Sequence, residues 1–299
     1  MAARSMRSPS LRPFDPHRDR AAVARLWASA LGDDWPVLPD AVDRLGAGHV
    51  LLVNRSLVGM IAVDPRGSIT FLAVEPAEQR RGHGTRLVGR ALDDFRRDGL
   101  AAVRVGSGGD HYVWPGVPTS CTAALAFFER LGWAEDDRTT DLVQDLRASD
   151  VVERMEGYPP PDGVDVAPAG PRLMADVIAF EDTHFPQWSR YFREPHDGVL
   201  IARDRHGSIL GSLLLDGPGR TASPYWPLLG DRCGAIGCVG VMPEQEGRGI
   251  GTAMVAAATR LLVDRGVHRC LIDWVVRVDF YGRLGYRPWR TYSMRSRGI

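Results

Sequence analysis

The sequence contains no lysine, so all 37 basic residues among its 299 are arginine. This absence excludes the phosphate-binding loop of P-loop nucleotide hydrolases, which requires a lysine. The 37 acidic residues bring the formal net charge to zero. A neutral chain has no bulk electrostatic attraction to nucleic acid or to an anionic membrane, so we expect neither as a partner. Arginine still suits phosphate recognition, because its planar guanidinium donates paired hydrogen bonds.

Cysteine is scarce, and long apolar runs are missing. No C-x-x-C pair occurs, and no cluster of cysteine and histidine has zinc spacing, so we expect no metal. The four cysteines are typical of free thiols in a reducing cytoplasm: Cys121, Cys233, Cys238 and Cys270. No apolar run approaches the roughly 20 residues that span a bilayer. The first ten residues are rich in arginine and serine and lack an apolar core, so they do not form a secretory signal. We expect a cytoplasmic protein.

An internal repeat organises the chain, whose length suffices for two ordinary domains. Residues 74–87 (VEPAEQRRGHGTRL) and 241–254 (VMPEQEGRGIGTAM) are identical at 6 of 14 positions, with an offset of 167 residues. A second pair follows in the same order, FFERLGW at 127–133 and FYGRLGY at 280–286. This period is far too long for a solenoid, so each copy is expected to be a whole domain.

The junction between the copies is marked by GYPPPDG at 157–163, which cannot continue a helix or a central strand. We place the boundary near residues 150–160, so that residues 1–150 and 160–299 form the two domains. Within each copy the patterns predict strands and helices in the same order, and therefore a mixed α/β sheet with helices on its faces. In the first copy, the predicted helices are 19–31, a helix after the glycine loop and 122–130, and the predicted strands are 49–53, 57–63, 69–74 and 101–105. In the second copy, the predicted helices are 171–181, 251–265 and 277–284, and the predicted strands are 164–167, 199–202, 209–215, 235–241 and 270–275.

Each copy carries a glycine loop between a strand and a helix. A helix N-terminus leaves backbone N–H groups unpaired and carries partial positive charge, and glycine lets a ligand approach closely, so such a loop binds phosphate. Arg80, Arg81 and Arg248 lie in the loops and can add charge-assisted hydrogen bonds. A single loop of this kind is equally explained as a tight turn without a ligand. Two copies, each followed by the same aromatic segment, favour a binding loop.

The loops resemble a known family. The pattern [QR]-x-x-G-x-[GA] resembles the cofactor loop of the GCN5-related N-acetyltransferases (GNAT), and it stands here as Gln79-Arg-Arg-Gly82-His-Gly84 and, less closely, as Glu246-Gly-Arg-Gly249-Ile-Gly251. The F-[FY]-x-R-L-G-aromatic segments resemble that family's last helix and strand. The resemblance covers nearly the whole chain, once per half. It implies two tandem GNAT-like domains, each a mixed, mostly antiparallel sheet flanked by helices.

The resemblance also implies the substrates and the mechanism. Acetyl-CoA would bind with its pyrophosphate on the loop amides and its pantetheine arm beside the preceding strand, and no metal would take part. A strand N–H would polarise the thioester carbonyl, the acceptor amine would attack directly, and a tyrosine of the last helix would protonate the thiolate. The residues so implied to bind the cofactor are Leu72, Ala73, Val74, Gln79, Arg80, Arg81, Gly82, His83, Gly84, Thr85, Val239, Gly240, Val241, Gly247, Arg248, Gly249, Ile250, Gly251 and Thr252.

The two halves differ at positions that matter for this mechanism. The family tyrosine is Tyr281 in the second copy, whereas the first copy has Phe128, which has no proton to give. Packing of Tyr281 as an ordinary core aromatic is the alternative. The glycine loops favour the first half instead, because Gln79 fits the family pattern and Glu246, its counterpart in the second half, does not. We therefore expect chemistry in the second half, with a first half that retains a cofactor loop.

The amine-deprotonating base is less clearly marked. Candidates in the second half are Glu181, Asp182, His184 and Asp273, of which Glu181 and Asp273 are our choice, and a water chain is the alternative. The aromatic residues of EDTHFPQWSRY (181–191) either line an acceptor pocket or form a helix packing face. The first copy has an excess of 14 residues at 106–119, expected to overhang its cleft. This segment is either a packed surface loop or a source of catalytic groups, with Asp110 or His111 as the base and Tyr112 as the acid.

The sequence thus predicts an N-acetyltransferase that acts on a small-molecule or peptide amine, with Tyr281, Asp273 and Glu181 as its catalytic residues. The alternative is an inactive protein that senses acyl-CoA or acts as a scaffold, because each half lacks one expected part. For the assembly we expect either a monomer with pseudo-dimeric halves or a homodimer.

Overall fold

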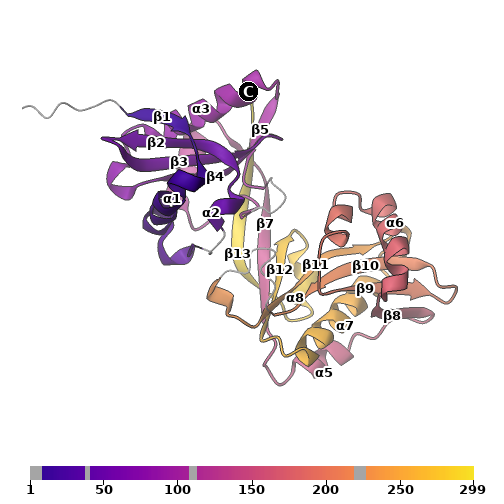
Figure 1. Ribbon diagram of the computed structural model, residues 1–299. Coiled ribbons are helices and arrows are strands. Elements are labelled where there is room, and N and C mark those ends of the chain that lie inside the picture. Colours follow the sequence, from indigo (N-terminus) through magenta and orange to yellow (C-terminus); the bar gives the residue numbers. More distant parts are fainter. Residues whose placement is uncertain (1–8, 38–40, 108–112, 219–226) are drawn as a thin grey trace, which may run out of the picture. The chain divides into compact units, whose positions relative to one another are not determined.

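The computed structural model describes residues 9–37, 41–107, 113–218 and 227–299. The chain divides into two compact units (Figure 1). Among the described residues, unit 1 holds 9–139, Pro227 and 291–299, and unit 2 holds 140–218 and 228–290.

Unit 1 is built on a mixed sheet with the strand order β1-β2-β3-β4-β5-β13. Neighbouring strands are antiparallel except β4 and β5, which are parallel. The strands are β1 (Ser10–Pro13), β2 (Ala47–Val53), β3 (Ser56–Asp64), β4 (Ser68–Val74), β5 (Ala102–Val105), the short β6 (Val117–Pro118), β7 (Ala134–Asp145) and β13 (Arg287–Gly298). The helices are α1 (Pro16–Leu31), α2 (Ala41–Arg44), α3 (His83–Arg97) and α4 (Thr122–Arg130), with single 3-10 turns at Gly32–Asp34 and Pro76–Glu78.

Unit 2 repeats this plan with the order β8-β9-β10-β11-β12-β7, and here β11 and β12 are the parallel pair. Its strands are β8 (Val164–Pro168), β9 (Gly198–Asp204), β10 (Ile209–Asp216), β11 (Cys233–Val241) and β12 (Arg269–Val275). The helices are α5 (Val151–Glu156), α6 (Met174–His184), α7 (Ile250–Asp264) and α8 (Val278–Gly282). Short 3-10 turns lie at Pro171–Leu173, Ser189–Phe192, Pro227–Leu229 and Pro243–Gln245. The predicted fold class, two mixed and mostly antiparallel sheets flanked by helices, is confirmed.

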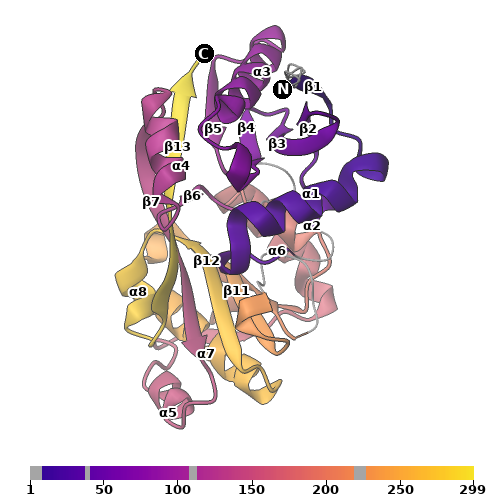
Figure 2. The same cartoon turned by 90° about the vertical axis from the view of Figure 1, so that its left-hand side faces the viewer.

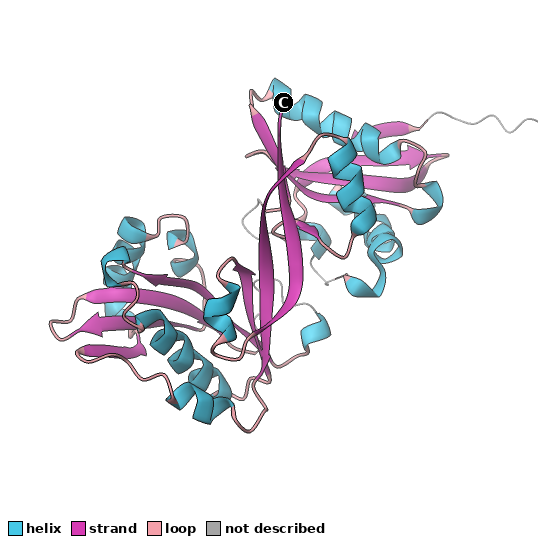
Figure 3. Cartoon of the chain, turned by 180° about the vertical axis from the view of Figure 1, so that it is seen from behind, coloured by secondary structure: helices cyan, strands magenta, loops and turns pink. Residues whose placement is uncertain are grey.

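Helices cover both faces of each sheet (Figure 3). In unit 1, α3 packs along β2, β3 and β4, while α1 lies against β3 and β4 (Figure 1). The predicted apolar face of the helix after the glycine loop is confirmed: Leu87, Val88, Ala91, Leu92 and Phe95 are all buried. Burial of such side chains stabilises the fold by about 1.5–3 kcal/mol for each large one. In unit 2, α5 and α7 pack on one apolar cluster, and α6 packs on another that includes Val199, Ile201 and Leu214.

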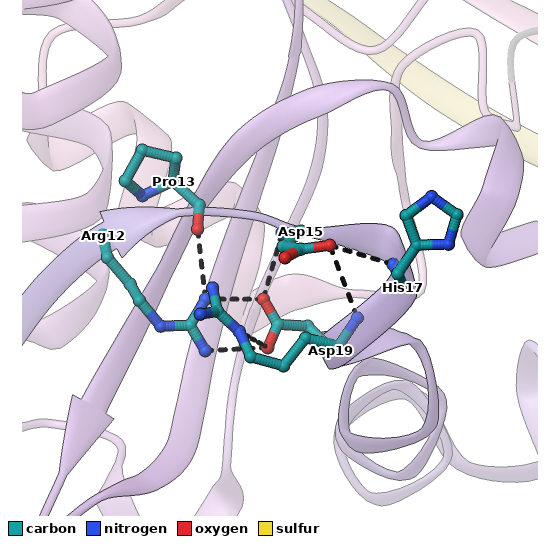
Figure 4. Close-up of polar contacts among 6 residues, drawn as sticks. Arg12, Pro13, Asp15, His17 and Asp19 are labelled. Carbon is teal, nitrogen blue, oxygen red and sulfur yellow. Dashed lines mark hydrogen bonds and ion pairs between the residues drawn. The ribbon is translucent and has the colours of Figure 1, made fainter.

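The start of α1 is fixed by its sequence. Asp15 caps the helix, because its side chain accepts hydrogen bonds from the backbone N–H groups of His17 and Arg18, and Pro16 follows at the first helical position (Figure 4). The guanidinium of Arg12 in β1 pairs with the buried Asp19 at 2.6 Å, which lowers the pKa of that carboxyl to about 2. The edge strand is thus tied to the first helix.

Each sheet is completed by a strand from the other half of the sequence. In unit 1, Arg295–Gly298 of β13 pair with Ala102–Val105 of β5, so the C-terminal strand belongs to the N-terminal unit. In unit 2, residues 140–145 of β7 pair with β12 (Figure 2). The segment where the sequence placed the junction is occupied by α5 and the turn after it. The proposed limits at residues 150 and 160 stay a prediction.

Candidate functional site

The two glycine loops have the same backbone conformation. Arg80 and Gly247, at equivalent positions, both have a positive φ, of 63° and 78°. Gly82 and Gly249 follow with φ of 81° and 83° and are the N-cap residues of α3 and α7. Neither helix has a side-chain cap, so the first amides of both are open to a ligand. The predicted loop residues therefore form two turns with equivalent geometry, of the kind that suits an anion.

The charged side chains of the loops have partners within the protein. Arg81 pairs with Glu78 at 2.9 Å, and Arg248 donates to the side-chain oxygen of Gln245. The exposed Glu246 lies 3.8 Å from the guanidinium of Arg277, which follows β12. The positive charge near this carboxylate therefore comes from Arg277. Arg248 lies nearer in sequence but pairs with Gln245. Gln79 donates to the backbone oxygen of Val74 at 3.0 Å, which ties the first loop to its strand.

The strand before each loop has an edge that is free for part of its length. In unit 1, β4 pairs with β5 at Ser68 and Ile69. In unit 2, β11 pairs with β12 from Cys233 to Ala235. Beyond these residues, in the described parts of both units, the remaining stretch of each strand has no register with its parallel neighbour. The predicted cofactor strands lie on these stretches: Leu72, Ala73 and Val74 in β4, and Val239, Gly240 and Val241 in β11.

A β-bulge in β11 shapes the free edge in unit 2. The register with β10 shifts between Ser212, which faces Gly240, and Leu214, which faces Gly237. The extra residue, Cys238, has a φ of 51°, which is rare for a residue with a side chain. Its thiol is half-buried but densely surrounded by protein, so burial raises its pKa well above the ordinary value, and the carboxylates of Asp273 and Glu181 raise it further. Cys238 is therefore a neutral group on the free stretch of β11.

Glu181 is a fully buried carboxyl on α6. The hydroxyl of Ser212 in β10 donates a hydrogen bond to its Oε1, and among the described residues Oε2 has no hydrogen-bond partner. Burial raises the pKa of Glu181 to about 7, while the Ser212 hydrogen bond opposes this shift and the charge of Asp182 adds to it. A carboxyl with this pKa exchanges its proton near neutral pH, as a general base requires.

Tyr281 lies on α8 with its ring edge-on to Phe280 at 4.7 Å and to Tyr286 at 6.3 Å. Burial raises the pKa of its phenol, and the carboxylate of Asp273 raises it further. The carboxylate of Asp273 raises the pKa of Cys238 as well as that of Tyr281, and Glu181 also raises that of Cys238, so the predicted residues act on one another within unit 2.

The other candidate bases in this segment have different environments. Asp182 is exposed and pairs with Arg193 at 2.6 Å, and this hydrogen bond lowers the pKa of its carboxyl. The ring of His184 packs at 4.8 Å from that of Phe180. These contacts of both side chains are thus with residues other than Cys238. The first-half candidates Asp110, His111 and Tyr112 lie outside the described residues.

The same face of unit 1 is filled with aromatic side chains. Met60 pairs with Ala73 as Ser212 pairs with Gly240, so Met60 is the equivalent of Ser212, and the 167-residue offset of the repeat makes Phe71 the equivalent of Cys238. Phe71 stacks on Trp27 of α1 at 5.1 Å, and Trp114 lies 5.1 Å from Trp27. All of these side chains are buried. Trp114 comes from the extra segment at 106–119, and its ring is buried against those of Trp27 and Phe71.

Phe128 confirms how closely the halves correspond around the lost tyrosine. Its ring is edge-on to Phe127 at 5.2 Å and to Trp133 at 5.7 Å, the arrangement of Tyr281 with Phe280 and Tyr286. Unit 1 thus has the packing without the hydroxyl.

Two residues of the unit 2 cleft were not identified from the sequence. Ser212 is a polar residue within the apolar run ILGSLLL (209–215), and such an interruption of a buried strand signals a specific partner. Cys238 gave no signal of its own, because a bulge depends on the register between two strands.

The described residues hold no group of three or more histidine, cysteine or acidic side chains that is placed to ligate a metal. Likewise, no helix in the described part of the chain is long and apolar enough to span a membrane.

Comparison with known proteins connects this geometry to a family. The model of the acetyltransferase (GNAT) family matches twice, at residues 20–133 and 170–286. A mycothiol acetyltransferase of Saccharomonospora viridis is 27% identical over 286 residues, which cover 85% of each chain. One of Pseudarthrobacter chlorophenolicus is 28% identical over 243 residues, covering 75% of this chain and 68% of that protein.

Two solved structures are similar over almost the whole chain. One contains a GCN5-related glucosamine N-acetyltransferase region in a fungal multi-domain β-N-acetylglucosaminidase, with a TM-score of 0.84 and 28% identity. It covers 99% of this chain, which spans 39% of the larger protein. The other is a tandem GNAT protein from the clavulanic acid biosynthesis pathway, with a TM-score of 0.67, and at 17% identity it shares the fold alone.

Proposed function

Since this chain belongs to the GNAT family and is an acetyl-CoA-dependent acetyltransferase, we propose that unit 2 performs the transfer and that the acceptor is the amine of a small polar molecule. The observation that carries this proposal is the buried Ser212–Glu181 pair of unit 2, and the carboxylate of Asp273, which acts on both Cys238 and Tyr281, supports it. In unit 1, the equivalents of Ser212, Cys238 and Tyr281 are Met60, Phe71 and Phe128, none of which has a proton to exchange.

The chain's own groups fit the donor substrate. The open amides at the start of α7 suit a pyrophosphate, because they combine unpaired N–H donors with the positive end of the helix dipole. The unpaired stretch of β11 offers backbone groups to the amide-bearing arm of coenzyme A, and an N–H of this strand is suited to polarise the thioester carbonyl. Unit 1 has the same loop and a free strand edge, so we propose that it binds coenzyme A without turnover.

The reaction requires a neutral amine, although most amines are protonated in water. Glu181 in its ionised form accepts a proton from the acceptor ammonium, and the amine nitrogen then forms a bond to the thioester carbon. The bond from that carbon to sulfur breaks, and its electron pair leaves with the thiolate. The second proton leaves nitrogen for the departing sulfur, which gives the neutral amide and the free thiol of coenzyme A. Acetyl transfer is thus direct, without an acyl-enzyme.

Tyr281 acts at the departing sulfur. Burial beside Asp273 keeps its phenol protonated at every physiological pH, so it is always able to donate a hydrogen bond. The same raised pKa makes Tyr281 a weaker acid than a free tyrosine, which opposes full transfer of its proton. We therefore propose hydrogen-bond stabilisation of the leaving thiolate as the main contribution of this residue.

The charge of the cleft favours a cationic acceptor. Glu181, Asp216 and Asp273 act on Cys238 as negative charges, and Arg190 acts on it as a positive one. An ammonium group entering this site is attracted by the excess of carboxylates. One relative is named for a glucosamine acceptor and others for mycothiol, so we propose a small amine of the amino-sugar type over a peptide amine. A cytoplasmic location, and a monomer with pseudo-dimeric halves or a homodimer, stay predictions from the sequence.

A transfer assay tests this proposal. Acetyl-CoA is mixed with the protein and with glucosamine, ethanolamine or a short peptide, and both free thiol and the acetylated amine are measured. We expect equal amounts of thiol and N-acetylated glucosamine, and less product with the peptide. Thiol release without any acetylated amine would rule out the proposed transfer.

A further inference from the structure

We propose that the stacked rings of Phe185 and Trp188 form a platform for the pyranose ring of an amino-sugar acceptor, which places the acceptor's amino group beside Glu181. This inference rests on the proposed function, because it assigns the acceptor class to the same cleft. It assigns substrate selection to Phe185 and Trp188, and it assigns no catalytic step to either.

The position of Phe185 follows from the strand register. Its ring lies against Gly240 so closely that a Cβ built on this glycine would stand 2.6 Å from a ring carbon. Gly240 pairs with Ser212 across β10 and β11, and Ser212 holds the carboxyl of Glu181. The ring of Phe185 and the carboxyl of Glu181 therefore lie over the same pair of strand residues, on the face of the sheet that α6 covers.

Trp188 extends this surface. Its ring is stacked on that of Phe185, with centroids 5.3 Å apart and an angle of 20° between the planes. Backbone hydrogen bonds fix the turn that carries both, from the N–H of Phe185 to the oxygen of Glu181 at 2.8 Å and from the N–H of Trp188 to the oxygen of Phe185 at 2.9 Å. Both side chains are half-buried, so part of the pair faces solvent. The platform is apolar and partly exposed, and Trp188 also packs against the cluster under α6.

The other aromatic residues of this segment are engaged differently. The guanidinium of Arg190 lies 4.6 Å above the ring of Tyr191 and donates to its hydroxyl at 2.7 Å. Phe192 is buried in the cluster under α6. Of the aromatics at 181–191, Phe185 contacts the cofactor strand at Gly240 and Trp188 stacks on Phe185, and both are partly exposed.

The chemistry of an amino sugar matches this arrangement. A pyranose ring has a flat face of C–H groups with partial positive charge, which suits the negative face of an aromatic ring. Its amino group, as an ammonium, suits the carboxyl of Glu181, whose buried Oε2 has no hydrogen-bond partner among the described residues. At the edge of the platform, Asp182, Ser189 and Arg193 form a hydrogen-bonded group that offers partners to hydroxyls. An acyclic amine has the ammonium without the flat ring and gains nothing from the platform.

The experiment compares KM for glucosamine with KM for ethanolamine, which has the same amino and hydroxyl groups without the ring. For Trp188→Ala we expect KM for glucosamine to rise about tenfold, the equivalent of 1.4 kcal/mol. KM for ethanolamine and for acetyl-CoA should stay within about twofold of wild type, and Trp188→Phe should restore most of the affinity. Tyr191→Ala is the matched control, because its ring face is already covered by Arg190, and should change neither KM. An equal rise for both amines, or no rise for glucosamine, would overturn the platform.

Saturation-transfer NMR separates this inference from the proposed function. With wild-type protein and glucosamine, irradiation of aromatic protons should transfer saturation to the C–H protons of the sugar ring, and Trp188→Ala should weaken that transfer. Sugar binding with this signature but no acetyl transfer would refute the proposed function and support the platform. Absence of transfer to the ring protons in the wild type would overturn the platform, whether or not the enzyme turns over.

Discussion

The hydroxyl of Ser212 in β10 donates a hydrogen bond to one oxygen of the buried Glu181 carboxyl, while the other oxygen has no partner among the described residues. This pair gives unit 2 a titratable group in its cleft with a pKa of about 7. Unit 1 has Met60 in place of the serine, so it lacks the pair.

The first prediction concerns the rate as a function of pH. If Glu181 is the base, kcat should rise as pH increases through about 7, because only the ionised carboxylate accepts a proton. Glu181→Gln should remove this limb and lower kcat by about 100-fold. Steady-state kinetics between about pH 5 and 9 measure both. An unchanged limb in the variant would assign it to another group.

The second prediction uses Ser212 as a positioning residue. Its hydrogen bond lowers the pKa of Glu181, so Ser212→Ala should raise that pKa and move the rising limb of kcat to higher pH. Ser212→Thr, which keeps the hydroxyl, should leave the limb near its original position. A lower kcat at every pH, with the rising limb at its original pH, would show that the serine merely supports packing.

The third prediction links Glu181 to stability. Its folded-state pKa of about 7 lies above the ordinary 4.5, so its contribution is present below about pH 4.5 and is lost as pH rises through 7. The shift corresponds to about 3 kcal/mol, as an order of magnitude. Glu181→Gln should therefore unfold at higher urea concentration than wild type at about pH 8, with a difference below about 1 kcal/mol at pH 5. A difference that does not change with pH would contradict this assignment.

The fourth prediction concerns the exchanged strands. Residues 1–150 alone lack β13, whose Arg295 is buried and donates to the backbone oxygen of Trp133 at 3.0 Å. This fragment should unfold without a cooperative transition, because the edge of β5 and its polar groups lose their partner. Fusion of residues 287–299 to the fragment through a flexible linker should restore cooperativity in thermal circular dichroism. Cooperative unfolding of residues 1–150 by themselves would mean that β13 is dispensable.

Local patterns in the sequence predicted the elements well, because periodicity and turn residues report short-range structure. The predicted helix 122–130 and strand 69–74 agree with α4 and β4 to within a residue. The predicted helix at 171–181 is in fact a 3-10 turn at Pro171–Leu173 followed by α6, which ends at His184. Pro171 stands at the start of the 3-10 turn. The glycine loops were identified because the αL conformation at Gly82 and Gly249 favours glycine.

Features that depend on distant pairing were not predictable in this way. The exchange of β13 depends on which edge a strand joins, and nothing in the local pattern of residues 287–298 specifies β5 as its neighbour. The pairing of Glu246 with Arg277 joins a loop to the end of a distant strand. The environment of Glu181 likewise arises from Ser212, 31 residues away in sequence. Tertiary contacts of this kind need the fold before they can be inferred.

The most direct test of catalysis in unit 2 is the kcat of Tyr281→Phe in acetyl transfer, with Phe128→Tyr as its mirror-image control. Tyr281→Phe keeps the ring and its edge-on contacts with Phe280 and Tyr286 and removes only the hydroxyl. We expect kcat to fall by about 100-fold with KM for acetyl-CoA unchanged, and Phe128→Tyr to leave kcat at the wild-type value. A wild-type kcat for Tyr281→Phe would contradict the assignment of catalysis to this tyrosine and to unit 2.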